Sequence, residues 1–407
     1  MSPLNIRSDF PVLQNNPNLI YLDSAATSLK PRPVLEAMDA YYNEFSANTG
    51  RGSHRLAREA SEKFEQARKE VASFVGAKEG SLVFTKNVTE AVNLVAVSLE
   101  RMGHFKPGDE IAVGFFEHHA NLLPWQQLCA RTGSKLKVAG LKEDFTLDME
   151  DLKAKVTKKT KMVSIAHVSN TVASIQDVKE IAKITHRNGA SGALCFIDGA
   201  QAVPHLEVDV KKINADFYGF SSHKMLGPTG IGALYAKEDL LAKMPPFSFG
   251  GGIIKSVSFE ITVFADGRNK FEPGTQPIAE ALGFAEACRY LKKLGMASVR
   301  DHEKKLTERA LEGLGRIKGL EMYCPKNPEK QAGVILFDVK GVDPLDLGVA
   351  LDEGRNIAVR TGFMCAEPMV RSINPKGLCR ASFYAYNTIE EIDALASEVT
   401  AITGHFR

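Results

Sequence analysis

Two charged residues stand where short apolar stretches end abruptly. Asp198 follows the stretch Leu194–Ile197, and Lys224 comes four residues after Phe217–Phe220. Short apolar runs that are rich in β-branched and aromatic residues are typical of buried strands. Ligands of open α/β sheets bind where the strands end. The acid and the lysine therefore predict a ligand site at the edge of a sheet.

Lys224 is the strongest candidate for chemistry. Most lysines are solvated and inert, but a partly desolvated lysine loses its proton more easily and can form a Schiff base with an aldehyde. Ser221, His223 and the turn at 227–230 offer hydrogen-bond donors to a phosphate. Together these residues indicate pyridoxal phosphate (PLP). Asp198 would then keep the cofactor ring nitrogen protonated, although a strand-end aspartate taken alone is as often a turn residue.

Other polar residues fit the same ligand. Gln201 follows Asp198 by three positions and could contact the ring hydroxyl. His118 and His119 follow a predicted strand at 110–115, and adjacent side chains of an extended chain point in opposite directions. This disfavours a metal-chelating pair and leaves one imidazole to stack on a cofactor ring. The segment 87–90 opens a predicted helix, whose free N–H groups could bind a phosphate or could simply be capped.

A cysteine and an arginine stand out in the C-terminal part. Cys365 lies in a segment with Gly and Pro, 360–368, which is predicted to be an exposed loop. A lone cysteine is usually inert, but one on such a loop is a candidate nucleophile. The six cysteines include no C-x-x-C pair, so neither a zinc site nor a disulfide framework is expected. Arg380, in the next predicted strand, could clamp a carboxylate or form a surface salt bridge.

The composition is that of a globular enzyme with two domains. The 407 residues are 44% hydrophobic and 25% charged, and the net charge of +2 gives no argument for nucleic acid or a membrane surface. The N-terminus lacks a signal-peptide pattern, so a cytoplasmic location is expected. Strands and helices alternate from 81 to 235, which predicts a mostly parallel sheet covered by helices. We expect a large domain at 16–270 and a smaller α/β domain at 271–407 that includes residues 1–15.

The order and spacing of eight motifs resemble those of the class V aminotransferase-like PLP enzymes, and among them the SufS-type cysteine desulfurases, also called selenocysteine lyases. The motifs are Tyr21–Thr27, Arg51–His54, Glu117–Asn121, His167–Asn170, Asp198–Gln201, Ser221–Lys224, Phe271–Thr275 and Arg360–Ala366. Each motif alone is weak or moderate, but together they are specific and span nearly the whole chain. The resemblance implies an α/β fold of the PLP-dependent transferase type, fold type I.

The resemblance also implies a role for each site residue. Lys224 would bind the cofactor covalently and move protons at the substrate, while Asp198, Gln201 and His118 would contact the cofactor ring. The cofactor phosphate would be bound by Thr89, Ser221 and His223, and by Thr275 from the other subunit of a homodimer. The substrate amino acid would be held by Asn170, Arg360 and Arg380, with Arg380 on its carboxylate. No metal ligand is implied.

The implied reaction uses Cys365 as the nucleophile. It would take the sulfur of L-cysteine, or the selenium of L-selenocysteine, and leave L-alanine with a persulfide on Cys365. An acceptor protein of the SufE or SufU type would collect the sulfur for iron–sulfur cluster assembly. Two segments depart from the family pattern: Phe363-Met364 replaces the usual His-His pair before the cysteine, and 169–173 lacks the usual glycine.

Two other interpretations stay open at this point. One is a different class V PLP enzyme, such as a cysteine C–S lyase or an aminotransferase, which would not need Cys365. The other is a non-catalytic scaffold that keeps the fold. The presence of Lys224, Asp198 and His118 together argues against a scaffold.

Overall fold

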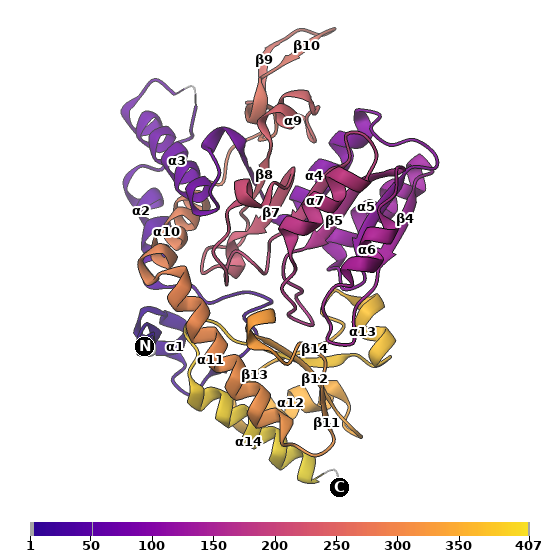
Figure 1. Ribbon diagram of the computed structural model, residues 1–407. Helices are drawn as coiled ribbons and strands as arrows, with labels where there is room; N and C mark the ends of the chain where they lie inside the picture. Colours follow the sequence, from indigo (N-terminus) through magenta and orange to yellow (C-terminus); the bar gives the residue numbers. More distant parts are fainter. Residues whose placement is uncertain (1–3, 51, 406–407) are drawn as a thin grey trace.

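A seven-stranded sheet forms the centre of the larger part of the molecule (Figure 1). The computed structural model describes residues 4–50 and 52–405, so Arg51 of the predicted motif lies outside the described residues. The strands, in spatial order, are β2 (Leu82–Thr85), β8 (Gly232–Ala236), β7 (Phe217–Ser221), β6 (Leu194–Asp198), β5 (Thr160–Ala166), β3 (Glu110–Gly114) and β4 (Lys135–Ala139). β8 runs antiparallel to β2 and β7, and the other adjacent strands of this sheet pair in parallel. The predicted mostly parallel sheet is therefore confirmed.

Helices cover both faces of this sheet, which explains the continuous apolar character of its strands. Along β6, Cys195 and Ile197 belong to the core on one face, whereas Leu194 and Phe196 belong to the core on the other. The first face is covered by α6 (Met149–Lys155) and α7 (Val178–Asn188), and the second by α4 (Val88–Arg101) and α5 (His119–Thr132). Every residue of β6 is buried, as expected for a strand between two helical layers.

Three further helices pack together beside the β2 edge of the sheet (Figure 1). They are α2 (Arg32–Glu44), α3 (Arg55–Phe74) and α10 (Ile278–Leu294). The apolar positions Ala60, Phe64, Ala67 and Val71 form the buried face of α3, as their three- and four-residue spacing predicts. Arg68 is also buried on this face, which the spacing does not predict.

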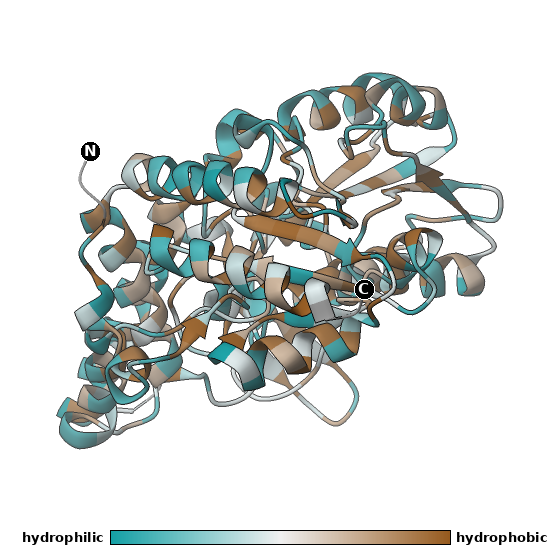
Figure 2. Ribbon diagram, turned by 90° about the horizontal axis from the view of Figure 1, so that it is seen from below, coloured by the Kyte–Doolittle hydropathy of each residue, from teal (hydrophilic) through white to brown (hydrophobic). Residues whose placement is uncertain are grey.

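The smaller part of the molecule is built on a four-stranded antiparallel sheet. Its strands, in spatial order, are β11 (Leu320–Met322), β12 (Val334–Val339), β15 (Leu378–Ser382) and β14 (Arg360–Gly362). It packs with α11 (Met296–Gly315), α12 (Pro344–Arg355) and α14 (Ile389–His405) around a core of its own. The capping box before α14 is present, because Thr388 N–H donates to Glu391 and Glu391 N–H donates to Thr388 Oγ1. Figure 2 shows hydrophobic residues on the strands and hydrophilic residues along the outer helices.

Two contacts bear on where the domains divide. β1 (Ile20–Tyr21) pairs with β13 (Ile357–Ala358) of the smaller part, and Asp23 forms a bridge with Ser382. α10 packs against α2 and α3 rather than against the small sheet. The division at 16–270 and 271–407 with 1–15 stays a proposal, in which residues 20–23 contact the smaller part and α10 contacts the larger part.

The remaining elements are short. They are the helices α1 (Pro11–Asn15), α8 (Val210–Ile213), α9 (Glu238–Lys243) and α13 (Glu367–Ile373), and the hairpin of β9 (Ile254–Val257) with β10 (Thr262–Phe264). The hairpin projects from one end of the molecule (Figure 1). Among residues 4–50 and 52–405, the helices include none with the length and apolar character that crossing a bilayer requires.

Candidate active site

A cavity of about 340 Å³ opens where β6 and β7 end and the small domain meets the large one. The N-terminal ends of α4 and α5 border it on the large domain, and the loop before α13 borders it on the small domain. Every residue predicted for the site lines this cavity except Thr275. The lining set is Thr89, His118, Asn170, Asp198, Gln201, Ser221, His223, Lys224, Arg360, Cys365 and Arg380.

Lys224 and Asp198 reach the cavity from neighbouring strands. Lys224 lies in a single 3-10 turn directly after β7, and Asp198 is the last residue of β6. Burial lowers the pKa of Lys224 to about 8, with Arg380 acting in the same direction and Asp198 against it. Burial raises the pKa of Asp198, which accepts a hydrogen bond from Ala200 N–H at 2.9 Å. A ligand that carries an aldehyde and a protonated ring nitrogen would satisfy both groups.

His118 is fixed at the start of α5 as a neutral ring. Its Nδ1 accepts a hydrogen bond from Ala120 N–H at 3.0 Å, so its proton lies on Nε2. Burial, together with the nearby Lys224 amine, lowers its pKa to about 3. The preceding residue, the buried Glu117, accepts hydrogen bonds from Asn121 Nδ2 at 2.7 Å and from Ala166 N–H at 3.0 Å. These bonds hold the loop before α5, so the imidazole is presented to the cavity as a flat, uncharged surface.

The N-terminal end of α4 supplies the phosphate side of the cavity. Thr89 lies in its first turn, and Val88 N–H donates to Ser221 Oγ at 3.0 Å. Gln201 donates to Ala25 O at 2.7 Å, which leaves its second N–H for a ligand. Burial and the neighbouring Lys224 lower the pKa of His223 to about 4. This side therefore offers helix N–H groups and neutral hydrogen-bonding side chains to an anion.

Lys30 lies just behind His223 and was missed by the sequence interpretation. Its Nζ donates to Thr27 Oγ1 at 3.0 Å, to Ser28 O and to His223 O at 3.3 Å. All three acceptors are neutral, and burial lowers the pKa of Lys30 to about 8. The only sequence signal was its place three residues after the motif Tyr21–Thr27.

Arg380 and Arg360 share one carboxylate, that of Asp23. Arg380 Nη2 lies 3.2 Å from Asp23 Oδ1, and Arg360 Nη2 lies 2.6 Å from Asp23 Oδ2. Arg380 is 3% exposed, so the alternative interpretation as a surface salt bridge is wrong. Within the described part of the chain, Arg380 Nε is buried with no hydrogen-bond partner. The sequence indicates Asp23 only as part of the motif Tyr21–Thr27, because its partners Arg360 and Arg380 lie near the other end of the chain.

Cys365 lies between β14 and α13 and faces the cavity. It is the one exposed cysteine, since the other five, all within the described residues, are buried. Cys195 and Cys288 are core residues, and both are 0% exposed. Met364 and Cys365 both adopt left-handed backbone conformations, with φ of 46° and 55°. Asn170 Nδ2 donates to Met364 O at 2.8 Å, so a large-domain residue binds this loop.

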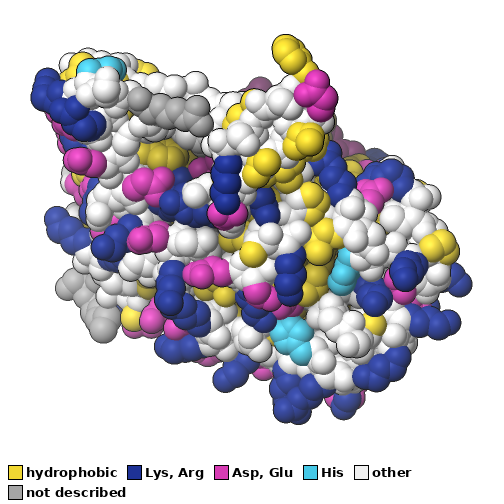
Figure 3. Space-filling view, turned by 90° about the horizontal axis from the view of Figure 1, so that it is seen from above, with side chains coloured by type: hydrophobic (Ala, Val, Ile, Leu, Met, Phe, Trp, Pro, Cys, Tyr) yellow, Lys and Arg dark blue, Asp and Glu magenta, His cyan; other side chains and the backbone are white. Residues whose placement is uncertain are grey.

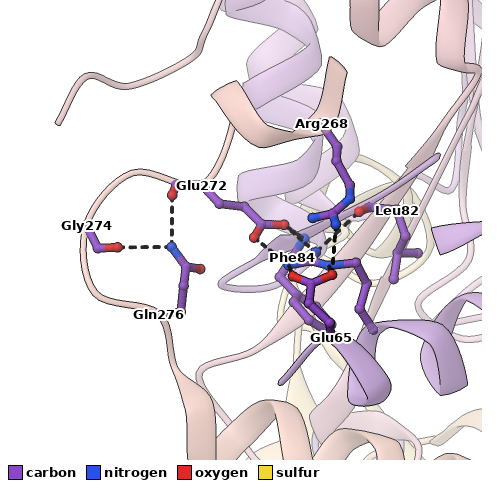
Figure 4. A network of polar contacts seen from close by, with 8 residues as sticks. Glu65, Leu82, Phe84, Arg268, Glu272, Gly274 and Gln276 are labelled. Carbon is purple, nitrogen blue, oxygen red and sulfur yellow. Dashed lines mark hydrogen bonds and ion pairs between the residues drawn. The ribbon is translucent and has the colours of Figure 1, made fainter. Parts of the chain in front are cut away.

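Thr275 is not among the residues that line this cavity. Its neighbours Glu272, Gly274 and Gln276 form a hydrogen-bonded turn (Figure 4). The Glu272 carboxylate accepts hydrogen bonds from both Nη atoms of Arg68, at 2.6 and 2.8 Å, and from Phe84 N–H at 2.7 Å. Gln276 donates to Glu272 O at 2.8 Å and to Gly274 O at 3.1 Å. The turn lines a second, open cavity of about 820 Å³. Thr275 is thus not brought together with the other predicted site residues within one chain.

The fold and the cavity define a PLP-dependent enzyme of the α/β transferase class. A lysine and a carboxylate end adjacent strands of a mostly parallel sheet, a neutral histidine lies beside them, and a helix begins at the phosphate side. The chain belongs to the aminotransferase class V family, because the model of that family matches residues 20–395. The cofactor is pyridoxal phosphate, which these residues fit.

Relatives and solved structures agree with this assignment. The chain is 42% identical to the "Probable cysteine desulfurase" of Halalkalibacterium halodurans, across 100% of this chain and 99% of that protein. It is 41% identical to the cysteine desulfurase of Thermococcus onnurineus NA1 in its apo structure, with a TM-score of 0.94 and coverage of 100% and 99%. A mutant of C-DES with glycine covalently linked to its PLP-cofactor is 23% identical and shares the fold, with a TM-score of 0.83 and coverage of 97% and 98%.

Proposed function

We propose that this chain is a cysteine desulfurase that converts L-cysteine to L-alanine and keeps the sulfur as a persulfide on Cys365. One observation carries the proposal. The one exposed cysteine of the chain opens into the same cavity as Lys224, Asp198 and Arg380. The names of the full-length relatives, which are 42% and 41% identical, support the same activity.

Arg380 is suited to bind the carboxylate of the substrate. Its Nη1 donates to Asn170 O at 2.9 Å and its Nη2 is bound to Asp23, so the guanidinium cannot turn freely. The buried Nε has no partner among the described residues, which leaves a donor for an incoming carboxylate. Asn170 and Arg360 line the same end of the cavity and complete the proposed substrate side.

Lys224 would bind the cofactor and then carry protons at the substrate. When bound, pyridoxal phosphate withdraws electrons from the α-carbon of the amino acid and so weakens the Cβ–S bond. A lysine whose pKa is lowered to about 8 can both accept and return a proton near neutral pH. Asp198 and His118 would hold the two sides of the ring, and Gln201 its oxygen. Thr89, Ser221 and His223 would bind its phosphate.

Cys365 would receive the sulfur as a thiolate. Its Sγ attacks the sulfur of the substrate while the Cβ–S bond breaks, and the electron pair of that bond passes to Cβ, which is then protonated. L-Cysteine and the Cys365 thiol become L-alanine and the Cys365 persulfide, so the atoms balance without a further oxidant or reductant. The alternative, a C–S lyase or aminotransferase that does not use Cys365, leaves the exposure of this thiol at the cavity unexplained.

The experiment is mass spectrometry of Cys365 after incubation of the holoenzyme with L-cysteine. We expect an adduct of about 32 Da, the mass of one sulfur bound to the thiolate nucleophile, together with L-alanine. Cys365→Ala should form neither the persulfide nor free sulfide, whereas the buried Cys129→Ala is the matched control and should behave as the natural protein. Undiminished sulfide release by Cys365→Ala would refute the proposal in favour of the lyase.

We also propose that the enzyme acts as a homodimer in which Thr275 contacts the cofactor phosphate of the partner subunit. The position of Thr275 outside the cavity of its own chain supports this, as does the fixed turn that presents it (Figure 4). The hairpin β9–β10 adds a second argument, because Val257, Phe259 and Ile261 are 61%, 107% and 68% exposed. Figure 3 looks down on this end of the molecule and shows hydrophobic side chains gathered on it. Surfaces of this kind are usually covered by a partner.

The remaining proposals concern the cellular setting. A reducing compartment would keep the thiol of Cys365 and the five buried thiols free, so we place the protein in the cytoplasm. The exposure of Cys365 would let an acceptor protein of the SufE or SufU type collect the sulfur for iron–sulfur cluster assembly. L-Selenocysteine is a second candidate substrate, since selenium occupies the place of sulfur in the same amino acid.

A further inference from the structure

The loop that carries Cys365 is held in an uncommon conformation. Two consecutive residues that are not glycine, Met364 and Cys365, have positive φ angles of 46° and 55°. Such residues are uncommon, and they persist only where the surrounding structure over-determines the backbone. The loop therefore needs contacts that fix it from outside.

His119 supplies two of these contacts, one from its backbone and one from its side chain. Its N–H donates to Cys365 O at 2.6 Å, and its Nε2 accepts a hydrogen bond from Glu367 N–H at 3.1 Å. His119 is the first residue of α5, so its N–H has no partner within the helix and is free to bind the loop. Asn170 adds the third contact, through Met364 O.

The side-chain contact completes the start of α13. Glu367 is the first residue of that helix, and the N-cap residue, Ala366, has no side chain that could bind its N–H groups. His119 Nε2 takes over the capping function from another domain, 248 residues away in the sequence. The cap sits two residues after the nucleophile, so it fixes the end of the loop closest to Cys365.

The paired histidines thereby have different tasks and opposite tautomers. His118 accepts through Nδ1 and lines the cofactor cavity, whereas His119 accepts through Nε2 and does not line it. Their rings are 6.4 Å apart and inclined by 54°. One residue thus presents a ring to the cofactor, and the next one connects the same helix start to the loop of the nucleophile.

We propose that His119 is a positioning residue that holds the Cys365 loop against the cofactor domain by capping α13 through Nε2. The inference rests on the proposed desulfurase function, since it assigns His119 to the sulfur-transfer step rather than to cofactor or substrate binding. Replacing the ring should therefore slow sulfur transfer and leave the binding of L-cysteine unchanged.

Three substitutions of His119 separate these effects. His119→Phe keeps a ring of similar volume and removes the acceptor, His119→Gln places an amide oxygen near the position of Nε2, and His119→Ala removes the side chain. We expect the single-turnover rate of the Cys365 sulfur adduct to fall about 10- to 100-fold in the Phe and Ala variants, the range in which small misplacements of reacting groups act. The Gln variant should recover most of the rate. If the Ala variant does not fold, the comparison of Phe with Gln decides.

Two further measurements complete the test. The change in cofactor absorbance on adding L-cysteine should give the same affinity in all variants. Hydrogen exchange of the peptide that spans 362–368 needs no turnover, and it should be faster in His119→Phe than in His119→Gln or the natural protein. His104→Phe is the matched control, since His104 lies away from the cavity, near Lys161 O.

Each outcome decides between the two proposals. A natural rate and natural exchange in His119→Phe would overturn the role of His119. A parallel loss of L-cysteine affinity and rate without rescue by Gln would reduce His119 to a general structural residue. Absence of the adduct from the natural protein would instead refute the desulfurase function, and hydrogen exchange would still test whether His119 holds the loop.

Discussion

The pH dependence of cofactor attachment follows from the burial of Lys224. Only the neutral amine can attack an aldehyde. Burial lowers its pKa from 10.5 to about 8, so about 10% of the amine is neutral at pH 7, compared with about 0.03% for an ordinary lysine. The cavity thus supplies about 300 times more reactive amine at pH 7 than a lysine in water, as the two pKa values require.

The assay is the rate at which the apoprotein combines with pyridoxal phosphate, followed by absorbance between pH 6 and 11.5. We expect the rate to rise about tenfold per pH unit below pH 8 and to level off above it, because deprotonation is complete there. Nα-acetyllysine measured in the same buffers is the reference, since it removes the contribution of the cofactor's own ionisations. The protein should reach its plateau about 2 to 3 pH units before this reference.

Two variants test the causes of the shift. Asp198 raises the pKa of Lys224 and Arg380 lowers it. Asp198→Asn should therefore move the inflection to lower pH, and Arg380→Gln should move it to higher pH. An inflection near pH 10.5 in the natural protein, or shifts of the opposite sign in the two variants, would refute the reasoning.

Two other predictions concern the shared carboxylate and the projecting hairpin. Asp23→Asn leaves Arg380 buried without a charged partner, which should cost about 3–5 kcal/mol of unfolding free energy. Arg360→Ala removes only a half-exposed partner of Asp23 and should cost less than about 1 kcal/mol. Equal losses of unfolding free energy for the two variants in guanidinium denaturation would contradict this. Phe259→Asp with Ile261→Asp should convert the proposed dimer to a monomer in light scattering while the circular dichroism spectrum is kept, and a natural protein that is already monomeric would dismiss the dimer.

The sequence predicts the centre of the site because the signal there is local. An apolar strand that stops at a charged residue defines both the strand and the position of that residue, as for Asp198 and Lys224. The start of α4 is equally local, since Asn87, which precedes it, is a capping residue. The apolar spacing of α3 likewise predicts its buried face, but not Arg68, because the acceptor Glu272 lies 204 residues away.

The missing parts of the site depend on contacts between distant segments. Asp23 binds Arg360 and Arg380 across 337 and 357 residues, and His119 binds Glu367 across 248. No local pattern distinguishes these residues from solvated ones, because their partners are brought near only by the packing of the two domains. Thr275 shows a different limit of prediction from one sequence, since the cofactor phosphate that it is proposed to contact belongs to another copy of the chain.

The two residues before Cys365 are apolar, and its thiol interacts electrostatically with Lys224 and Arg380 on the cofactor side. Phe363 lies beneath the guanidinium of Arg371, at 4.6 Å, and Met364 is buried, so neither residue brings an ionisable group. Burial lowers the pKa of Lys224 and of Arg380, and the nearby Cys365 opposes this lowering at both groups. Asn170 joins these parts physically, because its carbonyl binds Arg380 and its amide binds Met364 O. We therefore expect a substrate carboxylate bound by Arg380 to act through Asn170 on the loop that carries Cys365.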